Sequence, residues 1–140
     1  MANDFSDYFE SAILNWFKGS TFPAAPTNLY ASLHSAGPDE DGSPTNELTS
    51  DGSYARVAIP VADWSSITQD GGLATITNDE PVVFPTATAN YSGTATHFCI
   101  SDASTSGNLI ICGELATPRA ILNGDVDPTF APGSLTVQVG

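Results

Sequence analysis

Residues 94–115, TATHFCISDASTSGNLIICGEL, carry the strongest fold signal in this 140-residue chain. Two runs rich in apolar and β-branched residues flank a polar segment at Ser104–Gly107, a pattern that predicts an antiparallel hairpin. A turn at this place fixes which residues of the two strands lie opposite each other. The expected register pairs Cys99 with Cys112, Ile100 with Ile111, Phe98 with Gly113 and His97 with Glu114.

The two cysteines of the chain are too few for a disulfide scaffold. Directly opposed strand cysteines can be close enough to bridge, so Cys99 and Cys112 leave two interpretations open. Cytosolic thiols usually stay reduced, which favours two small packing side chains over a bridge. The chain has no Cys/His spacing typical of zinc sites, and no metal is expected.

Further strand candidates surround the hairpin at regular intervals, separated by Gly, Pro, Asn, Asp and Ser. They lie at residues 28–34, 54–61, 73–77, 82–84, 120–122 and 135–139. About eight strands without intervening helices of βαβ length predict a mainly β fold. The expected architecture is an antiparallel two-sheet sandwich, of which the jelly roll is one arrangement.

The N-terminal segment has a different period, which predicts one amphipathic helix. Apolar side chains recur three and four residues apart and form one stripe; they are Phe5, Tyr8, Phe9, Ala12, Ile13, Trp16 and Phe17. Asn3 or Asp4 is expected to cap the helix, and Gly19 can end it in the left-handed conformation. The sequence thus predicts a single domain overall, made of a helix at residues 1–19 and a β-sandwich at residues 20–140.

An isolated helix of this length is marginal in water, so the aromatic stripe must dock on something. Its partner is either the β domain of the same chain or a neighbouring subunit, and the sequence favours neither. The candidate interface residues are Phe5, Tyr8, Phe9, Trp16 and Phe17.

The charge balance limits the possible partners. Sixteen Asp and Glu oppose only Lys18, Arg56 and Arg119, which gives a formal net charge of −13. Phosphate backbones and anionic membrane surfaces would repel such a chain, so neither nucleic acid nor a membrane is an expected partner. No apolar run could span a bilayer, and the acidic start is unlike a secretory signal; synthesis in the cytosol is the default.

Signals for catalysis are weak. The acidic run at residues 39–42 invites a calcium interpretation, but an EF-hand loop would need Gly at Pro44 and Glu at Ser50, so a solvated loop is expected. His34 and His97 lie outside any recognisable catalytic motif, and structural or surface roles are expected for both. The chain is therefore predicted to be a non-enzyme without a cofactor.

Taken together, several turn and packing motifs carry a family resemblance. They are FPAAPTNLYASLH (22–34), YARVA (54–58), VFPTAT (83–88), HFCISDA (97–103), GNLIICGEL (107–115), NGD (123–125) and FAPGSLTV (130–137). In this order they resemble a family of small structural proteins of tailed bacteriophages. The resemblance covers nearly the whole chain.

Members of that family are labelled either tail-fibre-like or head decoration (cement) proteins, and the latter sit as trimers on the capsid. The lack of shaft repeats and the high acidity favour decoration. The resemblance then implies a homotrimer bound to the major capsid protein on the outer head surface of the virion, after assembly in the host cytoplasm. The alternative is a tail or tail-fibre component that contacts the host receptor.

Overall fold

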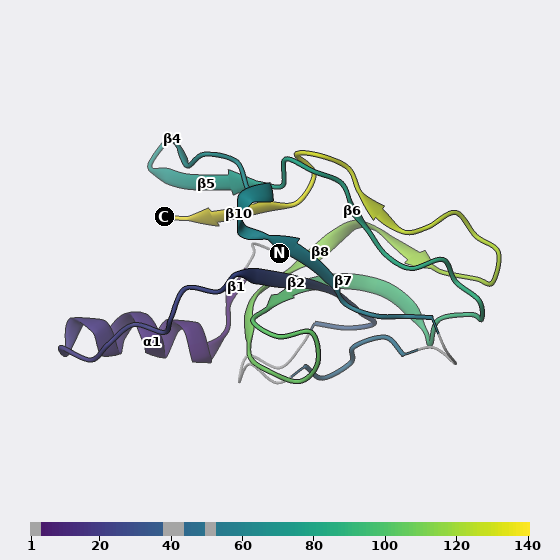
Figure 1. Ribbon diagram of the computed structural model, residues 1–140, viewed down its shortest axis with the longest axis horizontal. Coiled ribbons are helices and arrows are strands. Elements are labelled where there is room, and N and C mark those ends of the chain that lie inside the picture. Colours follow the sequence, from purple (N-terminus) through teal and green to yellow (C-terminus); the bar gives the residue numbers. More distant parts are fainter. Residues whose placement is uncertain (1–3, 38–43, 50–52) are drawn as a thin grey trace.

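The computed structural model describes residues 4–37, 44–49 and 53–140. It is mainly β with antiparallel strands and one helix near the N-terminus, which confirms the predicted fold class (Figure 1). The elements are β1 (Asp4–Phe5), α1 (Asp7–Phe17), β2 (Asn28–His34), β3 (Val57–Pro60), a 3₁₀ turn (Val61–Asp63), β4 (Thr68–Asp70), β5 (Leu73–Thr77), β6 (Val82–Val83), β7 (Thr94–Ser101), β8 (Leu109–Ala120), β9 (Thr129–Phe130) and β10 (Thr136–Val139).

The strands of the described residues form three sheets, where the sequence predicted two. The large sheet has the order β1-β8-β7-β2-β3, and smaller sheets have the orders β10-β5-β4 and β6-β9. In Figure 1, β4, β5, β6 and β10 lie on one side of the large sheet. The core lies between these layers and contains, among others, Leu33, Phe84, Phe98, Ile100, Ile111, Ile121 and Leu135. One shared core thus joins the three sheets into a layered β body.

The central hairpin has the predicted register. Cys99 lies opposite Cys112, Ile100 opposite Ile111 and His97 opposite Glu114. Cys99 and Cys112 are joined by a disulfide, with their Cα atoms 4.1 Å apart. The favoured interpretation, two reduced packing side chains, is therefore wrong for this structure, because direct opposition across the hairpin brings the two sulfur atoms within bonding reach.

The connection after β2 is packed in part rather than wholly solvated. Leu48 is 1% exposed and belongs to the core, and its backbone N–H donates to the carbonyl of Leu33 at 2.9 Å. Residues 44–49 therefore lie against the end of β2, where Ser32 and His34 are fully buried. The acidic run at residues 39–42 lies outside the described residues.

The helix begins later than predicted. Asp4 and Phe5 form β1 and pair with Cys112 and Ile111 of β8, so Phe5 is not part of the helix. The cap is Ser6, whose hydroxyl accepts from the backbone N–H of Phe9 at 3.4 Å; Asp4 does not cap, and Asn3 lies outside the described residues. Pairing with the open edge of β8 outweighs the helical period there. At the other end, Gly19 has the expected left-handed backbone, with φ +86°.

Candidate interaction surface at the N-terminal helix

Ser6 fixes the root of α1 to the edge of the large sheet. Its backbone N–H donates to the carbonyl of Ile110 at 3.0 Å, and its hydroxyl donates to the carbonyl of Leu109. The same hydroxyl caps the helix, and Ser6 is 6% exposed. β8 thus holds the start of α1 through both the backbone and the side chain of Ser6.

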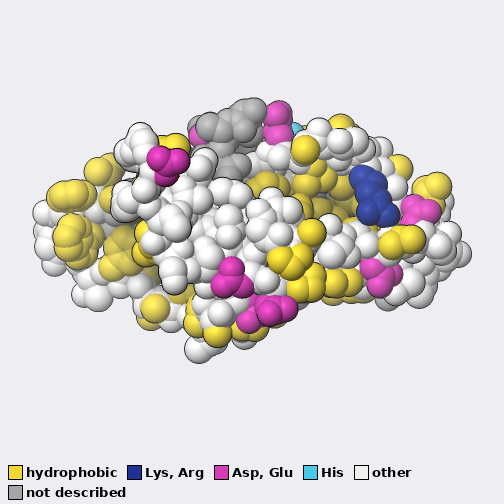
Figure 2. Space-filling model, turned by 90° about the horizontal axis from the view of Figure 1, so that it is seen from above, with side chains coloured by type: hydrophobic (Ala, Val, Ile, Leu, Met, Phe, Trp, Pro, Cys, Tyr) yellow, Lys and Arg dark blue, Asp and Glu magenta, His cyan; other side chains and the backbone are white. Residues whose placement is uncertain are grey.

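The far end of α1 exposes large apolar side chains. No residue of α1 is buried, and Leu14, Trp16 and Phe17 are 64%, 58% and 74% exposed. Figure 1 shows α1 extending beyond the sheets, and Figure 2 shows hydrophobic side chains gathered at that end of the molecule. Trp16 and Phe17 meet edge-on with ring centroids 5.4 Å apart. We call Trp16 and Phe17 the aromatic tip; contiguous exposed apolar groups of this kind mark interaction sites.

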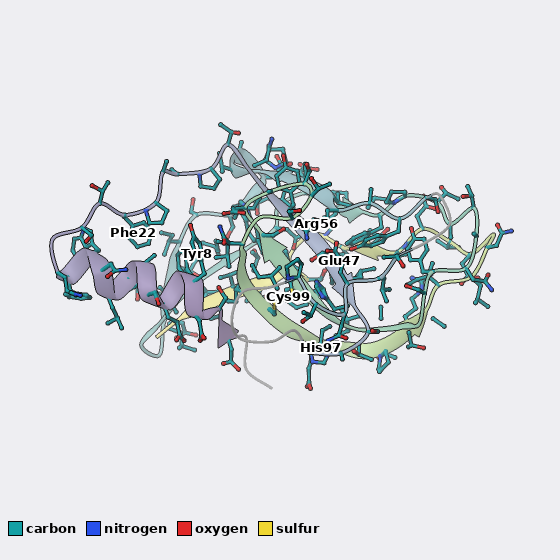
Figure 3. All side chains as sticks on the ribbon, turned by 90° about the horizontal axis from the view of Figure 1, so that it is seen from below. Tyr8, Phe22, Glu47, Arg56, His97 and Cys99 are labelled. Atoms are coloured by element: carbon teal, nitrogen blue, oxygen red, sulfur yellow. A yellow bond between two sulfur atoms is a disulfide. The ribbon has the colours of Figure 1, made fainter. Side chains whose placement is uncertain are left out.

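The segment after Gly19 runs back beside α1 and forms a groove at the root of the helix. Phe22, on this returning segment, meets Phe9 edge-on with centroids 5.7 Å apart, and Figure 3 shows Phe22 and Tyr8 between the two stretches of chain. The groove has a volume of about 350 Å³. Its lining is almost wholly apolar: Tyr8, Phe9, Phe22, Pro23, Ala24, Ala25, Pro26, Leu29 and Ile110, with Asp102 as the charged member. We call this the root groove.

One run of the sequence, which includes the aromatic tip and the returning segment, is free of acidic residues although the whole chain is strongly acidic. Residues 11–38 contain none of the sixteen Asp and Glu, and Lys18 is their only charged side chain. Asp102, at the root groove, accepts from the backbone N–H of Asn108 at 2.7 Å. The aromatic tip and most of the root groove therefore form a surface that another acidic molecule can approach without strong repulsion.

The five predicted interface residues occupy three different environments. Phe5 packs against the core from β1, Tyr8 and Phe9 are half-buried in the root groove, and Trp16 and Phe17 are exposed. The stripe is thus divided between the chain's own body and solvent. Leu14, Phe22 and the prolines 23 and 26 also belong to these surfaces but were not predicted from the sequence. The uncharged, proline-flanked run directly after the helix stop was the available signal for Phe22 and the two prolines.

A polar cluster holds together the connection after β2, the segment before β3 and the turn between β7 and β8. Arg56, with a side chain 4% exposed, donates from Nε and Nη2 to the two carboxylate oxygens of Glu47 at 2.9 and 2.7 Å. Its Nη1 donates to Ser101 Oγ and to the carbonyls of Ala103 and Ser106. Figure 3 shows Glu47 and Arg56 side by side. All these contacts are internal, so the cluster joins loops together.

Burial and hydrogen bonding shift the pKa of the Glu47 carboxyl in opposite directions. Burial raises it, but hydrogen bonds from Arg56 and from the Tyr54 hydroxyl, at 2.9 Å, outweigh burial and leave the pKa lowered. The hydrogen bonds between Arg56 and Glu47 raise the pKa of Arg56. Burial raises the pKa of Tyr54. The pair is therefore held in its charged form.

The two histidines differ in environment. His34 is fully buried, its Nδ1 lies 2.9 Å from the carbonyl of Thr45, and its Nε2 lies 2.9 Å from Ser32 Oγ. Since a carbonyl only accepts, Nδ1 carries the proton and Nε2 accepts from Ser32. His97 Nε2 lies 3.7 Å from Glu114 Oε1 across the hairpin. Within residues 4–37, 44–49 and 53–140 there is no group of three or more potential metal ligands and no helix long and apolar enough to cross a membrane.

Comparison with known proteins places the chain in one family. Residues 4–138 match the family model described as podophage GP4 fiber I protein gp80. The search of curated proteins finds no match. The matched range includes the anchored helix, the aromatic tip, the root groove and almost the whole β body. The chain therefore belongs to the podophage GP4 fiber I protein gp80 family, and it is a structural protein of a bacteriophage virion.

Proposed function

We propose that this chain is a fibre subunit of a podophage virion and that it is joined to its neighbours through α1. The match of residues 4–138 to a family named as a podophage fiber protein carries this proposal. The structure supports it through the aromatic tip, because Trp16 and Phe17 stand exposed on a helix whose root is fixed by Ser6. A β body with one projecting helix end that exposes apolar side chains is suited to assembly with identical subunits.

In this proposal the chain acts passively, as a homotrimer and without a reaction centre. Burial of Trp16 and Phe17 against a neighbour supplies the free energy of assembly, since aromatic side chains dominate such contacts. Several equivalent contacts in one symmetric assembly then gain strength through effective concentration. Support for a passive role also comes from His34, whose ring is buried and hydrogen-bonded on both nitrogens.

Head decoration is the second candidate function, and the charge favours it. A chain with sixteen acidic and three basic groups suits the outside of a shell, away from packaged DNA. A decoration protein would bind the major capsid protein in the mature shell and stabilise that state by mass action.

Copy number separates the two candidates. Peptide quantification by mass spectrometry on purified virions, with isotope-labelled standards, gives the ratio of this chain to the major capsid protein. The fibre proposal predicts a small fixed number of copies per particle, divisible by three. A ratio near one to one would overturn it in favour of decoration.

A further inference from the structure

We infer that the aromatic tip of one copy inserts into the root groove of a second copy, so that the chain assembles head to tail. The proposed function uses the aromatic tip for contact with a neighbour, and here that neighbour is a second copy of the chain. Only the place of this contact in the virion rests on the proposed function. The two halves of the contact are Trp16 and Phe17 on one copy and the groove beside Phe9 and Phe22 on the next.

A single chain presents both halves but cannot join them. Tyr8 and Phe9 lie in the first turn of α1, and Trp16 and Phe17 lie in its last. A straight helix of eleven residues holds its ends about 16 Å apart, at about 1.5 Å per residue. The anchoring of Ser6 to Leu109 and Ile110 also prevents the helix from folding back. The groove of one copy therefore needs the tip of another.

Charge favours a second copy at this contact. Two chains of charge −13 repel each other over most of their surfaces, so they can associate only where acidic groups are sparse. Residues 11–38, which contain the tip and much of the groove, are such a region. Lys18, the positively charged residue of this region, directly follows the tip. Asp102, which lines the groove, is negatively charged. Insertion of the tip thus brings Lys18 of one copy toward Asp102 of the next.

The contact is heterologous, because it joins two different surfaces of the chain. Such contacts close into a ring or extend into a filament. A ring of three fits the proposed homotrimer. The mass of the purified chain tests this directly, and this result does not depend on the copy number in the virion, so the two proposals can fail separately.

Sedimentation velocity on the full chain tests the tip. We expect the wild type to sediment at about three times the mass of 14.5 kDa, and the variant Trp16→Gln/Phe17→Gln to sediment as a single chain, with the dissociation constant raised about 100-fold or more. The matched control is Ile67→Gln/Val126→Gln, which removes side chains that are 70% and 83% exposed elsewhere and should keep the wild-type mass. A single-chain wild type, or a tip variant that keeps the wild-type mass, would overturn the inference.

A second variant tests the root groove. Ala25→Glu places a carboxylate in the exposed, apolar wall of the groove and should also give single chains, whereas Ala116→Glu, at an exposed position of β8, should not. Circular dichroism and thermal melts would establish that each variant is folded.

Mixing the two defective variants identifies the geometry of the contact. The tip variant keeps an intact groove and the Ala25→Glu variant keeps an intact tip, so head-to-tail insertion predicts that the mixture forms two-chain complexes and nothing larger. If two helices instead packed symmetrically tip to tip, the Ala25→Glu variant would still associate with itself. That outcome, or a mixture that stays as single chains, would refute insertion into the groove.

Discussion

The ring of Phe9 meets the ring of Phe22 edge-on, with centroids 5.7 Å apart, and so ties α1 to the segment that runs back from its end. Such pairs contribute about 0.5–1.5 kcal/mol beyond their buried area. We predict a coupling of that size in a double-mutant cycle of Phe9→Ala and Phe22→Ala, measured by urea unfolding in the Trp16→Gln/Phe17→Gln background to remove any effect of association. Strict additivity of the two substitutions would show that the rings do not support each other.

Removal of Arg56 should be strongly destabilising. The Arg56 side chain is 4% exposed, and its charge neutralises that of Glu47. Arg56→Ala would therefore leave the Glu47 carboxylate between the loops without its hydrogen bonds from Arg56. Loss of one partner of a buried ion pair costs about 3–5 kcal/mol. Chemical denaturation should show this decrease in the free energy of unfolding, whereas Arg119→Ala, at an exposed arginine, should change it by less than about 0.5 kcal/mol. Equal effects for the two arginines would contradict the assigned role of Arg56.

The Cys99–Cys112 disulfide should stabilise the chain measurably. It closes a short loop, with a sequence separation of 13, for which constraint of the unfolded chain contributes about 2–4 kcal/mol. The variant Cys99→Ala/Cys112→Ala should lose about this much in urea unfolding. Dithiothreitol should destabilise the wild type similarly and leave the variant unchanged. If the wild type does not respond to the reductant, the bridge makes no contribution in solution.

The free energy of unfolding should fall in mild acid because of His34. Burial lowers its pKa below the ordinary value of 6.5, although the hydrogen bond to Thr45 opposes this shift. The unfolded chain therefore binds the proton more readily, and stability is lost as the pH falls from 6.5 toward the folded pKa, by at most about 1.4 kcal/mol per pH unit. Below pH 4.5 the free energy of unfolding falls further, because the pKa of the Glu47 carboxyl is also lowered in the folded chain.

Urea unfolding at several pH values tests the part played by His34. The variant His34→Gln should show a flatter dependence between pH 6.5 and 5 than the wild type, whatever its absolute stability. An unchanged slope in His34→Gln would assign the acid sensitivity to other groups.

The parts of the fold that depend on neighbouring residues could be predicted from the sequence. The register of the β7–β8 hairpin followed from the polar turn near Ser104–Gly107, because a short turn fixes which residues face each other. The end of α1 followed from Gly19. Gly71 and Gly72, both with positive φ, form the turn between β4 and β5, and this signal could have revealed β4, which was missed.

The parts that depend on distant residues could not be predicted. Phe5 continues the helical period, and only its pairing with Ile111 turns it into a strand. Glu47 and Leu48 are on a polar loop, but Arg56 and the core bury them. The root groove exists because the chain turns back after Gly19 and sets Phe22 beside Phe9, an arrangement that no local pattern encodes.

The location of the chain on intact particles tests whether it is a fibre subunit. Cryo-electron microscopy of purified virions, labelled with gold-conjugated antibody fragments raised against the β body, would show where the subunit lies. If the chain is a fibre subunit, the gold lies on the fibres and the head shell stays bare. Gold spread evenly over the head, with unlabelled fibres, would contradict it.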